Sequence, residues 1–168
     1  MFISIAIHTA PMKVIQTIPD MPKPVTEPEV SKFLESKLNL QIATVDEEGY
    51  PSIQPVWFIY DRQAEKIYTA TPKMSKKAQN IQKNPDKVYF SIDDENFPYK
   101  GVKGRASAKI SEDIQKNLPI VSEINMKYLG TLEHPLAKMI IDNTKKGIEV
   151  VIELTPKFFS AWDFSKGM

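Results

Sequence analysis

The 168-residue sequence contains no cysteine, only two histidines and only two arginines. Without cysteine the chain has no disulfide, no thiolate nucleophile, no iron–sulfur cluster and no cysteine-based zinc site. His8 and His134 are far apart in sequence, and neither belongs to a motif with ligand spacing, so we expect no metal site built by the protein. Difficult chemistry in this chain therefore requires a bound organic cofactor.

Neither charge sign dominates, and no hydrophobic run is long. Lys and Arg total 22 against 21 Asp and Glu, which gives a net charge of +1 and no general attraction to nucleic acid or to an anionic membrane. The apolar stretch 1–10 has no basic flank and falls short of the ~20 residues that cross a bilayer. With no export signal and no cysteine, the sequence predicts a cytoplasmic protein without nucleic-acid or membrane partners.

The glycine-rich signatures of common nucleotide and hydrolase sites are also missing. No Gly-Lys-Ser/Thr follows a glycine-rich run, and the nearest approach to a Gly-x-Gly-x-x-Gly motif is the pair Gly101 and Gly104. No Gly-x-Ser-x-Gly elbow is present, and two isolated histidines disfavour a Ser-His-Asp triad. These absences exclude most common enzyme classes, and no side chain stands out as a catalytic acid or base.

Prolines, by contrast, are concentrated near the N-terminus. Five of the 13 lie in residues 11–28, so we expect residues 1–28 to form an extended arm and residues 29–168 to form one domain. A capping box of Thr26 and Glu29, with Pro28 in the first turn, predicts that a helix begins there.

Beyond this helix, the period of the apolar residues separates strands from helices. Strands are predicted over 40–45, 52–60, 66–71, 87–92, 102–110, 148–154 and 157–164. Helices are predicted over 75–83 and twice within the insertion 111–147, with a kink at Pro119. Strands joined by hairpin-length links favour an α+β fold, an antiparallel barrel with peripheral helices.

One segment has the composition of a phosphate site. A predicted strand ends near Thr69 and Thr71, and Ser75, Lys76 and Lys77 then open a helix. Free amides at a helix N-terminus, a hydroxyl and two ammonium groups suit a phosphate. The same residues also suit an ordinary serine cap followed by solvated lysines, which composition alone favours.

Two aromatic segments are candidates for binding a planar ring. Gln54-Pro55-Val56-Trp57 lies in the predicted strand 52–60, where proline marks an edge or a bulge and leaves backbone groups unpaired. Trp162 follows the last predicted strands and can stack on a ring or plug the end of the barrel. An aromatic-rich core is the alternative for both segments.

Taken together, these segments resemble the flavin-binding split-barrel family related to pyridoxamine 5'-phosphate oxidase. The resemblance runs over residues 29–110 and 148–164. The motifs that carry it are the run IATVDEEGYPSIQPVWF at 42–58, Ser-Lys-Lys-Ala at 75–78 with Asn-Pro at 84–85, Val-Lys-Gly-Arg-Ala at 102–106, and Thr-Pro-Lys…Ala-Trp-Asp at 155–163.

The resemblance implies a six-stranded antiparallel Greek-key split β-barrel and a homodimer with two FMN sites at the subunit interface. It places the 53–58 strand along the isoalloxazine ring and the Ser-Lys-Lys turn at the phosphate, with two aromatic residues reaching in from the partner chain. The implied cofactor-binding residues are Gln54, Pro55, Val56, Trp57, Tyr68, Thr69, Thr71, Ser75, Lys76, Lys77 and, from the partner, Tyr99 and Trp162.

The sequence departs from true pyridoxamine phosphate oxidases. Those enzymes place an Arg and a Lys in the second strand and an Arg-x-His stretch near the C-terminus, whereas residues 52–60 here carry no charge and the chain ends WDFSKGM. We therefore expect an FMN-binding oxidoreductase with a different small-molecule substrate or electron donor. The alternatives are a deazaflavin-dependent reductase, with Lys73, Lys100 and Lys103 along a groove for the acidic tail, or a non-enzymatic flavin-binding or interaction module.

Overall fold

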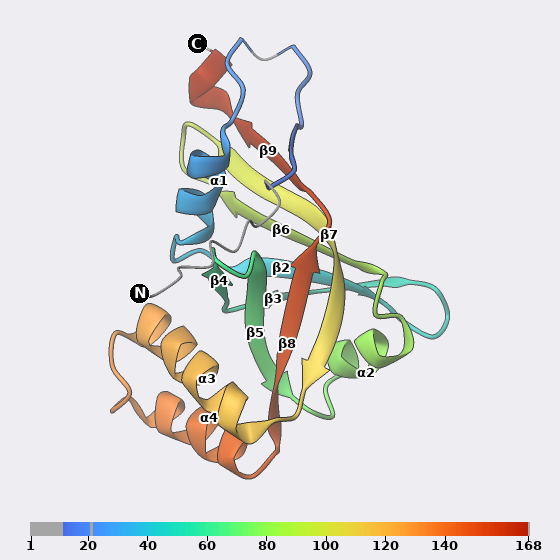
Figure 1. The fold of residues 1–168 in the computed structure, drawn as a ribbon, viewed down its shortest axis with the longest axis vertical. Coiled ribbons are helices and arrows are strands. Elements are labelled where there is room, and N and C mark those ends of the chain that lie inside the picture. Colours follow the sequence, from blue (N-terminus) through green and yellow to red (C-terminus); the bar gives the residue numbers. More distant parts are fainter. Residues whose placement is uncertain (1–11, 21, 168) are drawn as a thin grey trace, which may run out of the picture.

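The computed structural model describes residues 12–20 and 22–167 and contains nine strands and four α-helices in that part of the chain (Figure 1). The strands are β1 (Val14–Gln16), β2 (Leu40–Val45), β3 (Pro51–Val56), β4 (Ile59–Asp61), β5 (Lys66–Pro72), β6 (Val88–Asp94), β7 (Lys100–Ser111), β8 (Glu149–Pro156) and β9 (Phe159–Asp163). The helices are α1 (Glu27–Leu34), α2 (Lys76–Lys83), α3 (Ile114–Leu129) and α4 (Pro135–Lys145), and the 3₁₀ turn η1 (Phe164–Gly167) follows β9.

The sheet confirms the predicted α+β class, but its number of strands differs from the six that the resemblance implies. Its order is β3-β2-β6-β7-β8-β5-β4, with β9 paired to β7 and β1 paired to β9. These pairs are antiparallel except β1–β9, and within the described residues the end strands β3 and β4 do not pair with each other. In the described residues the sheet is therefore a mainly antiparallel split arrangement of nine strands, where the resemblance implied six, and it is not closed.

The predicted strand 52–60 is wrong as a single element. It divides into β3, which pairs with β2, and β4, which pairs with β5 at the other end of the sheet. Trp57 and Phe58 make the crossing between them. The backbone of Phe58 bonds to side chains of α3 instead of to a neighbouring strand, because the Tyr128 hydroxyl accepts from its N–H and the Lys127 ammonium donates to its carbonyl.

Part of the predicted N-terminal arm packs against the sheet. Met12 is buried, and Val14 to Gln16 form β1 against β9, with Val14 opposite Phe159. The predicted start of α1 is confirmed, since the Glu29 carboxylate accepts a 2.8 Å hydrogen bond from the N–H of Thr26. Lys166 near the C-terminus also bonds Glu29, and this contact, with the Thr26 bonds, lowers the pKa of Glu29 to about 2. The predicted arm residues 1–11 lie outside the described part.

Strand β7 joins the two halves of the sheet. Its first residues, Lys100 to Lys103, pair with β9, and its last residues, Ala106 to Ser111, pair with β8. The chain passes from β8 to β9 beside Gly104, where there is room only because this residue has no Cβ. Figure 1 shows the long β7 ribbon running alongside β9 in the upper part of the molecule and alongside β8 in the lower part.

The helices cover the sheet at separate places. Figure 1 shows α3 and α4 as a hairpin at the lower end of the molecule, and this hairpin contacts β8, while α2 packs against β2 and β7. Four consecutive buried residues, Glu149 to Ile152, begin β8, as expected for a strand covered on both faces. Pro119 lies inside α3 without ending it. The hairpin thus lies beside the ends of β5 and β8, where the candidate site is found.

Candidate functional site

A small cavity of about 190 Å³ lies between the end of β3, the end of β5 and three helices. Pro55, Val56 and Trp57 line it from the β3 crossing, Thr71 from β5 and Lys77 from the first turn of α2. Five of the predicted cofactor-binding residues therefore meet at one cavity, although they come from three separate segments of the chain.

The edge position of β3 explains why this wall is open to a ligand. β3 is the end strand of the sheet, so the backbone groups on its outer side have no strand partner in the described chain. Pro55 is exposed and Ile53 is 63% exposed, so one face of this strand is open to solvent in the single chain. The predicted proline-marked edge is confirmed.

The predicted phosphate turn has the geometry of a capped helix N-terminus. The Ser75 hydroxyl accepts a 3.3 Å hydrogen bond from the N–H of Ala78 and lies 3.0 Å from the Thr71 hydroxyl. Lys76 is exposed and pairs with Glu47 at 3.3 Å, a carboxylate that also holds Lys83. The two lysines of the turn thus point to different surroundings, since Lys77 lines the cavity.

Three other predicted residues lie near this region without lining the cavity. Gln54 donates a hydrogen bond to the Ser52 hydroxyl at 3.1 Å, and its side-chain carbonyl oxygen is buried without a partner in the described chain. Tyr68 and Thr69 lie on β5, where Thr69 is fully buried and burial raises the pKa of Tyr68. Their contact with a cofactor stays a prediction.

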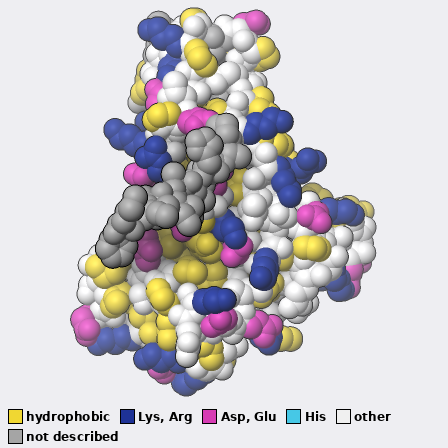
Figure 2. All heavy atoms as spheres, viewed as in Figure 1, with side chains coloured by type: hydrophobic (Ala, Val, Ile, Leu, Met, Phe, Trp, Pro, Cys, Tyr) yellow, Lys and Arg dark blue, Asp and Glu magenta, His cyan; other side chains and the backbone are white. Residues whose placement is uncertain are grey.

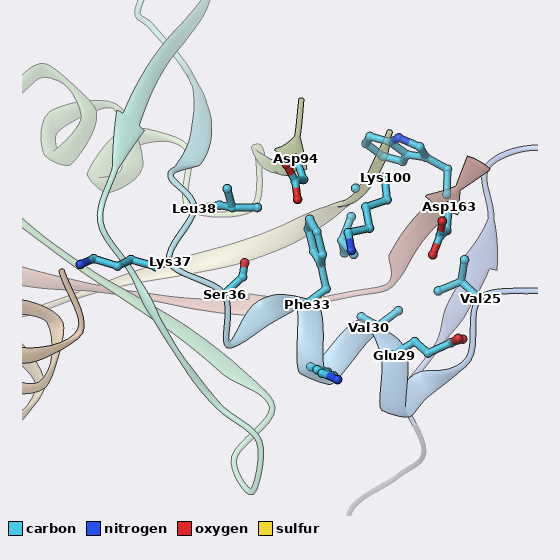
Figure 3. A pocket seen from close by; sticks show the side chains of 14 residues that line it. Val25, Glu29, Val30, Phe33, Ser36, Lys37, Leu38, Asp94, Lys100 and Asp163 are labelled. Atoms are coloured by element: carbon cyan, nitrogen blue, oxygen red, sulfur yellow. The ribbon is translucent and has the colours of Figure 1, made fainter. Parts of the chain in front are cut away.

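The remaining two predicted residues lie at a second, larger cavity. Trp162 lines a cavity of about 490 Å³ between α1 and the strands β6, β7 and β9, and Tyr99 packs against Trp162 with ring centroids 5.7 Å apart. Figure 3 shows Phe33 of α1 standing in this cavity between Asp94 and Lys100. The two cavities share no lining residue, so one chain does not bring Trp162 to Trp57.

The helical hairpin supplies lining residues that were not predicted from the sequence. Ile124, Asn125 and Ile140 line the smaller cavity, and the Asn125 side-chain oxygen is buried with no hydrogen-bond partner among the described residues. Glu149 lines it from the start of β8. A lone carboxylate ahead of the apolar run Val150 to Ile152 was the only sequence signal for Glu149, and it is weak because strand ends commonly carry charge.

The aromatic wall of the cavity is fixed by α3. Trp57 stacks on Tyr128 with ring centroids 4.9 Å apart and an angle of 4° between the rings. The Tyr128 hydroxyl donates to the Leu38 carbonyl at 2.6 Å, and the Lys127 ammonium lies 3.8 Å from the Phe58 ring centroid. Burial lowers the pKa of Lys127 to about 8 and raises the pKa of Tyr128 to about 12. These contacts hold the Trp57 indole in one orientation.

The surface around these sites mixes both charge signs. On the face in Figure 2, basic and acidic side chains are interspersed, and hydrophobic side chains gather over the end that carries α3 and α4. None of the helices in residues 12–20 and 22–167 combines the length and hydropathy that crossing a membrane requires.

Comparison with known proteins assigns the family. A profile of the family described as "Pyridoxamine 5'-phosphate oxidase" matches residues 26–163, which is most of the chain. The chain belongs to this family. Within it, the cavity residues 55–57, Thr71 and Lys77 all fall inside the matched region, and so do Asn125 and Glu149.

Solved structures of relatives share the fold of this pyridoxamine 5'-phosphate oxidase family member. The conserved hypothetical protein Rv2991 from Mycobacterium tuberculosis superposes with a TM-score of 0.72 and 22% identity, covering 85% of this chain and 88% of that one. A structure named "F420 Reductase" gives a TM-score of 0.64 and 28% identity, covering 81% and 98%. The curated relative "Heme oxygenase HutZ" of Vibrio cholerae is 30% identical over 69 residues, 41% of this chain and 38% of that protein.

The hydrogen bond between Tyr128 of α3 and Leu38 can be tested for its part in holding the ring that stacks on Trp57. Replacing Tyr128→Phe keeps the stacked ring and removes two hydrogen bonds, the 2.6 Å bond to the Leu38 carbonyl and the bond from the Phe58 N–H, so we expect the free energy of unfolding to fall by about 2 kcal/mol in urea titrations. Tyr99→Phe is the matched control, with a change within about 0.5 kcal/mol. A Tyr128→Phe variant with the same free energy of unfolding as wild type would show that the hydroxyl contributes nothing to stability.

Proposed function

We propose that this chain is an oxidoreductase that binds a phosphate-bearing flavin, FMN, between two copies of itself. The observation that carries the proposal is the single cavity joining Pro55, Val56 and Trp57 to Thr71 and Lys77 beside the N-terminus of α2. An aromatic wall and an edge strand with unpaired backbone groups suit a planar heterocycle. A capped helix N-terminus with lysines suits its phosphate.

The size of the cavity supports a site completed by a second chain. Its volume of about 190 Å³ is below the roughly 300 Å³ at which pockets for such ligands begin. Tyr99 and Trp162, the residues assigned to the partner in the dimer, lie away from this cavity in their own chain. In the proposed dimer they approach the cavity of the other subunit, where they exclude water from the ring.

The protein's own contribution is to bind and orient the cofactor. Trp57, held by Tyr128, packs at the ring, and the α2 amides with Lys76 and Lys77 hold the phosphate. When bound, the flavin supplies the hydride or electron transfer. The uncharged residues 52–60 do not offer the Arg and Lys that grip pyridoxamine phosphate, so the substrate is a different small molecule.

A deazaflavin is the second candidate cofactor. The observation that favours it is the structure named "F420 Reductase", which is 28% identical and is covered over 98% of its own length. Haem fits less well, although the curated relative is named a haem oxygenase. His134, the histidine within the described residues, caps α4 through Nδ1 and lines neither cavity.

The test is flavin titration of the purified protein, followed by absorbance and by quenching of flavin fluorescence. We expect FMN to bind, and we expect a variant with Lys76→Ala and Lys77→Ala to bind it about 100-fold more weakly, since two charge-assisted contacts are lost. The control is Lys83→Ala with Lys87→Ala, which removes the same charge away from the first turn. Equal FMN affinity of the two variants would refute the phosphate assignment. Binding of deazaflavin but not FMN would select the second candidate.

A further inference from the structure

A buried carboxylate faces the lysine of the proposed phosphate site. Glu149, at the start of β8, is 8% exposed and lines the same cavity as Lys77 of α2. In the described part of the chain its carboxylate forms no ion pair and accepts no side-chain hydrogen bond, and the nearest cation acts on it only at longer range. The cavity therefore holds a cation and a carboxylate that are close enough to interact but are not in contact.

Lys77 is the charged group that faces Glu149. From β5 the cavity presents Thr71, from α3 Ile124 and Asn125, and from α4 Ile140, all uncharged. Among the described residues, no second cation is available to neutralise Glu149 once Lys77 is engaged by something else. The other lysine of the turn, Lys76, has its own carboxylate, Glu47, at the surface.

This arrangement has a consequence for any anion that binds there. An anionic group that contacts Lys77 takes over the cation that faces Glu149 and places a second negative charge beside the carboxylate. In a buried site both changes oppose the ionised carboxylate strongly, because screening by water is weak. The carboxylate then favours its protonated form.

We propose that Glu149 determines which anions this site accepts, so that a phosphate-ester group engages Lys77 only together with one proton, which the Glu149 carboxylate takes up. This inference rests on the proposed function. The proton comes from solvent, an O–H bond forms on the carboxylate, and no electron is transferred. Glu149 thereby adjusts the charge of the site to the charge of its ligand.

The state of Glu149 in the free protein agrees with this role. Burial raises the pKa of Glu149 to about 7, and Lys77 alone opposes that rise. Burial also lowers the pKa of Lys77, against the attraction of Glu149. At neutral pH the carboxylate is therefore near its midpoint, so a nearby anion changes its protonation readily.

The experiment measures FMN affinity by fluorescence quenching from about pH 6.5 to about pH 8.5, where the phosphate ester is mostly a dianion throughout. We expect wild-type affinity for FMN to fall about 10-fold over this range, because binding consumes a proton that becomes scarcer. Glu149→Gln should remove this fall and bind FMN more tightly than wild type at the upper pH. Calorimetry in buffers of different ionisation enthalpy should show uptake of up to about one proton in wild type only.

Two controls isolate the carboxylate and the phosphate. Glu47→Gln removes the carboxylate beside Lys76 and should keep the pH dependence, since its hydrogen bonds with Lys83 and Lys76 lower the pKa of Glu47, away from this range. The affinity of wild type for riboflavin, which lacks the phosphate, should not show the fall of about 10-fold with rising pH. A pH dependence that persists in Glu149→Gln would overturn the inference and assign the effect to Lys77.

Failure of the inference and failure of the proposed function are distinguishable. Wild-type FMN binding with no pH dependence overturns the role of Glu149 and leaves the flavin site intact. Absence of flavin binding at every pH overturns the proposed function and this inference with it.

Discussion

Gly104→Ala is expected to lower the free energy of unfolding by about 3 kcal/mol, because the added methyl group has no space. A Cβ at this position would overlap the carbonyl oxygen of Phe158 and lie 2.8 Å from Cζ of Phe90. Phe158 sits in the turn between β8 and β9, which crosses β7 here, and the N–H of Lys157 bonds the Arg105 carbonyl at 2.7 Å. Relief of the overlap requires a backbone shift and not a rotamer change.

Urea titration followed by tryptophan fluorescence measures this loss, and Ser107→Ala on the same strand is the control. Ser107 is half-buried, and its truncation should change the free energy of unfolding by less than about 0.5 kcal/mol. A Gly104→Ala variant as stable as wild type would mean that the β8–β9 turn does not need its close approach to β7.

Glu149→Gln is expected to raise the free energy of unfolding at about pH 8 by about 2 kcal/mol. The pKa of Glu149 is raised from 4.5 to about 7, so the folded state binds this proton more tightly than the unfolded chain. The stabilising contribution of the protonated carboxyl is complete below pH 4.5 and is lost as pH rises through about 7. The amide that replaces the carboxyl has no proton to lose in this range, although Lys77 then loses the attraction of the carboxylate that faces it, which reduces the gain.

The measurement is the free energy of unfolding from about pH 5 to about pH 8 in both proteins. Wild type should lose stability across this window, and the variant should lose less. Glu153→Gln is the control on the same strand, since its carboxylate pairs with Lys66 and its removal leaves Glu149 unchanged. Parallel curves for wild type and Glu149→Gln would contradict a buried, proton-binding Glu149.

The class of the fold was predictable because short-range pattern determines it. Residues 40–45 form β2 with the predicted bounds and alternate between buried and half-buried positions, and Ser75 caps α2 as its composition predicts. The division of residues 52–60 was not predictable, since it depends on Tyr128 and Lys127, which lie 70 and 69 positions along the chain from Phe58. Periodicity reports which residues are apolar but not where a strand changes partner.

The candidate site was predictable only where a short-range sequence pattern marks its residues. Pro55, Trp57 and Lys77 were found because their local motifs carry the chemistry of a ring or a phosphate. Asn125 and Glu149 carry no motif, and their importance comes only from burial at one cavity after the α3–α4 hairpin has packed. Trp162 lines the other cavity of its own chain, so its assigned role at the smaller cavity depends on the proposed dimer.

The pairing of β1 with β9 has a consequence for how the protein is made. The Thr17 and Ser160 hydroxyls, 2.7 Å apart in the structure, lie 143 positions apart in the chain, so this corner closes only after Ser160 has been synthesised. Contacts of such long sequence separation form late in folding. On the ribosome, Lys100 to Lys103 of β7 therefore keep an uncovered strand edge until β9 emerges. A nascent chain stalled before residue 159 exposes that edge to other nascent chains. Aggregation through this edge is therefore favoured until β9 has been added.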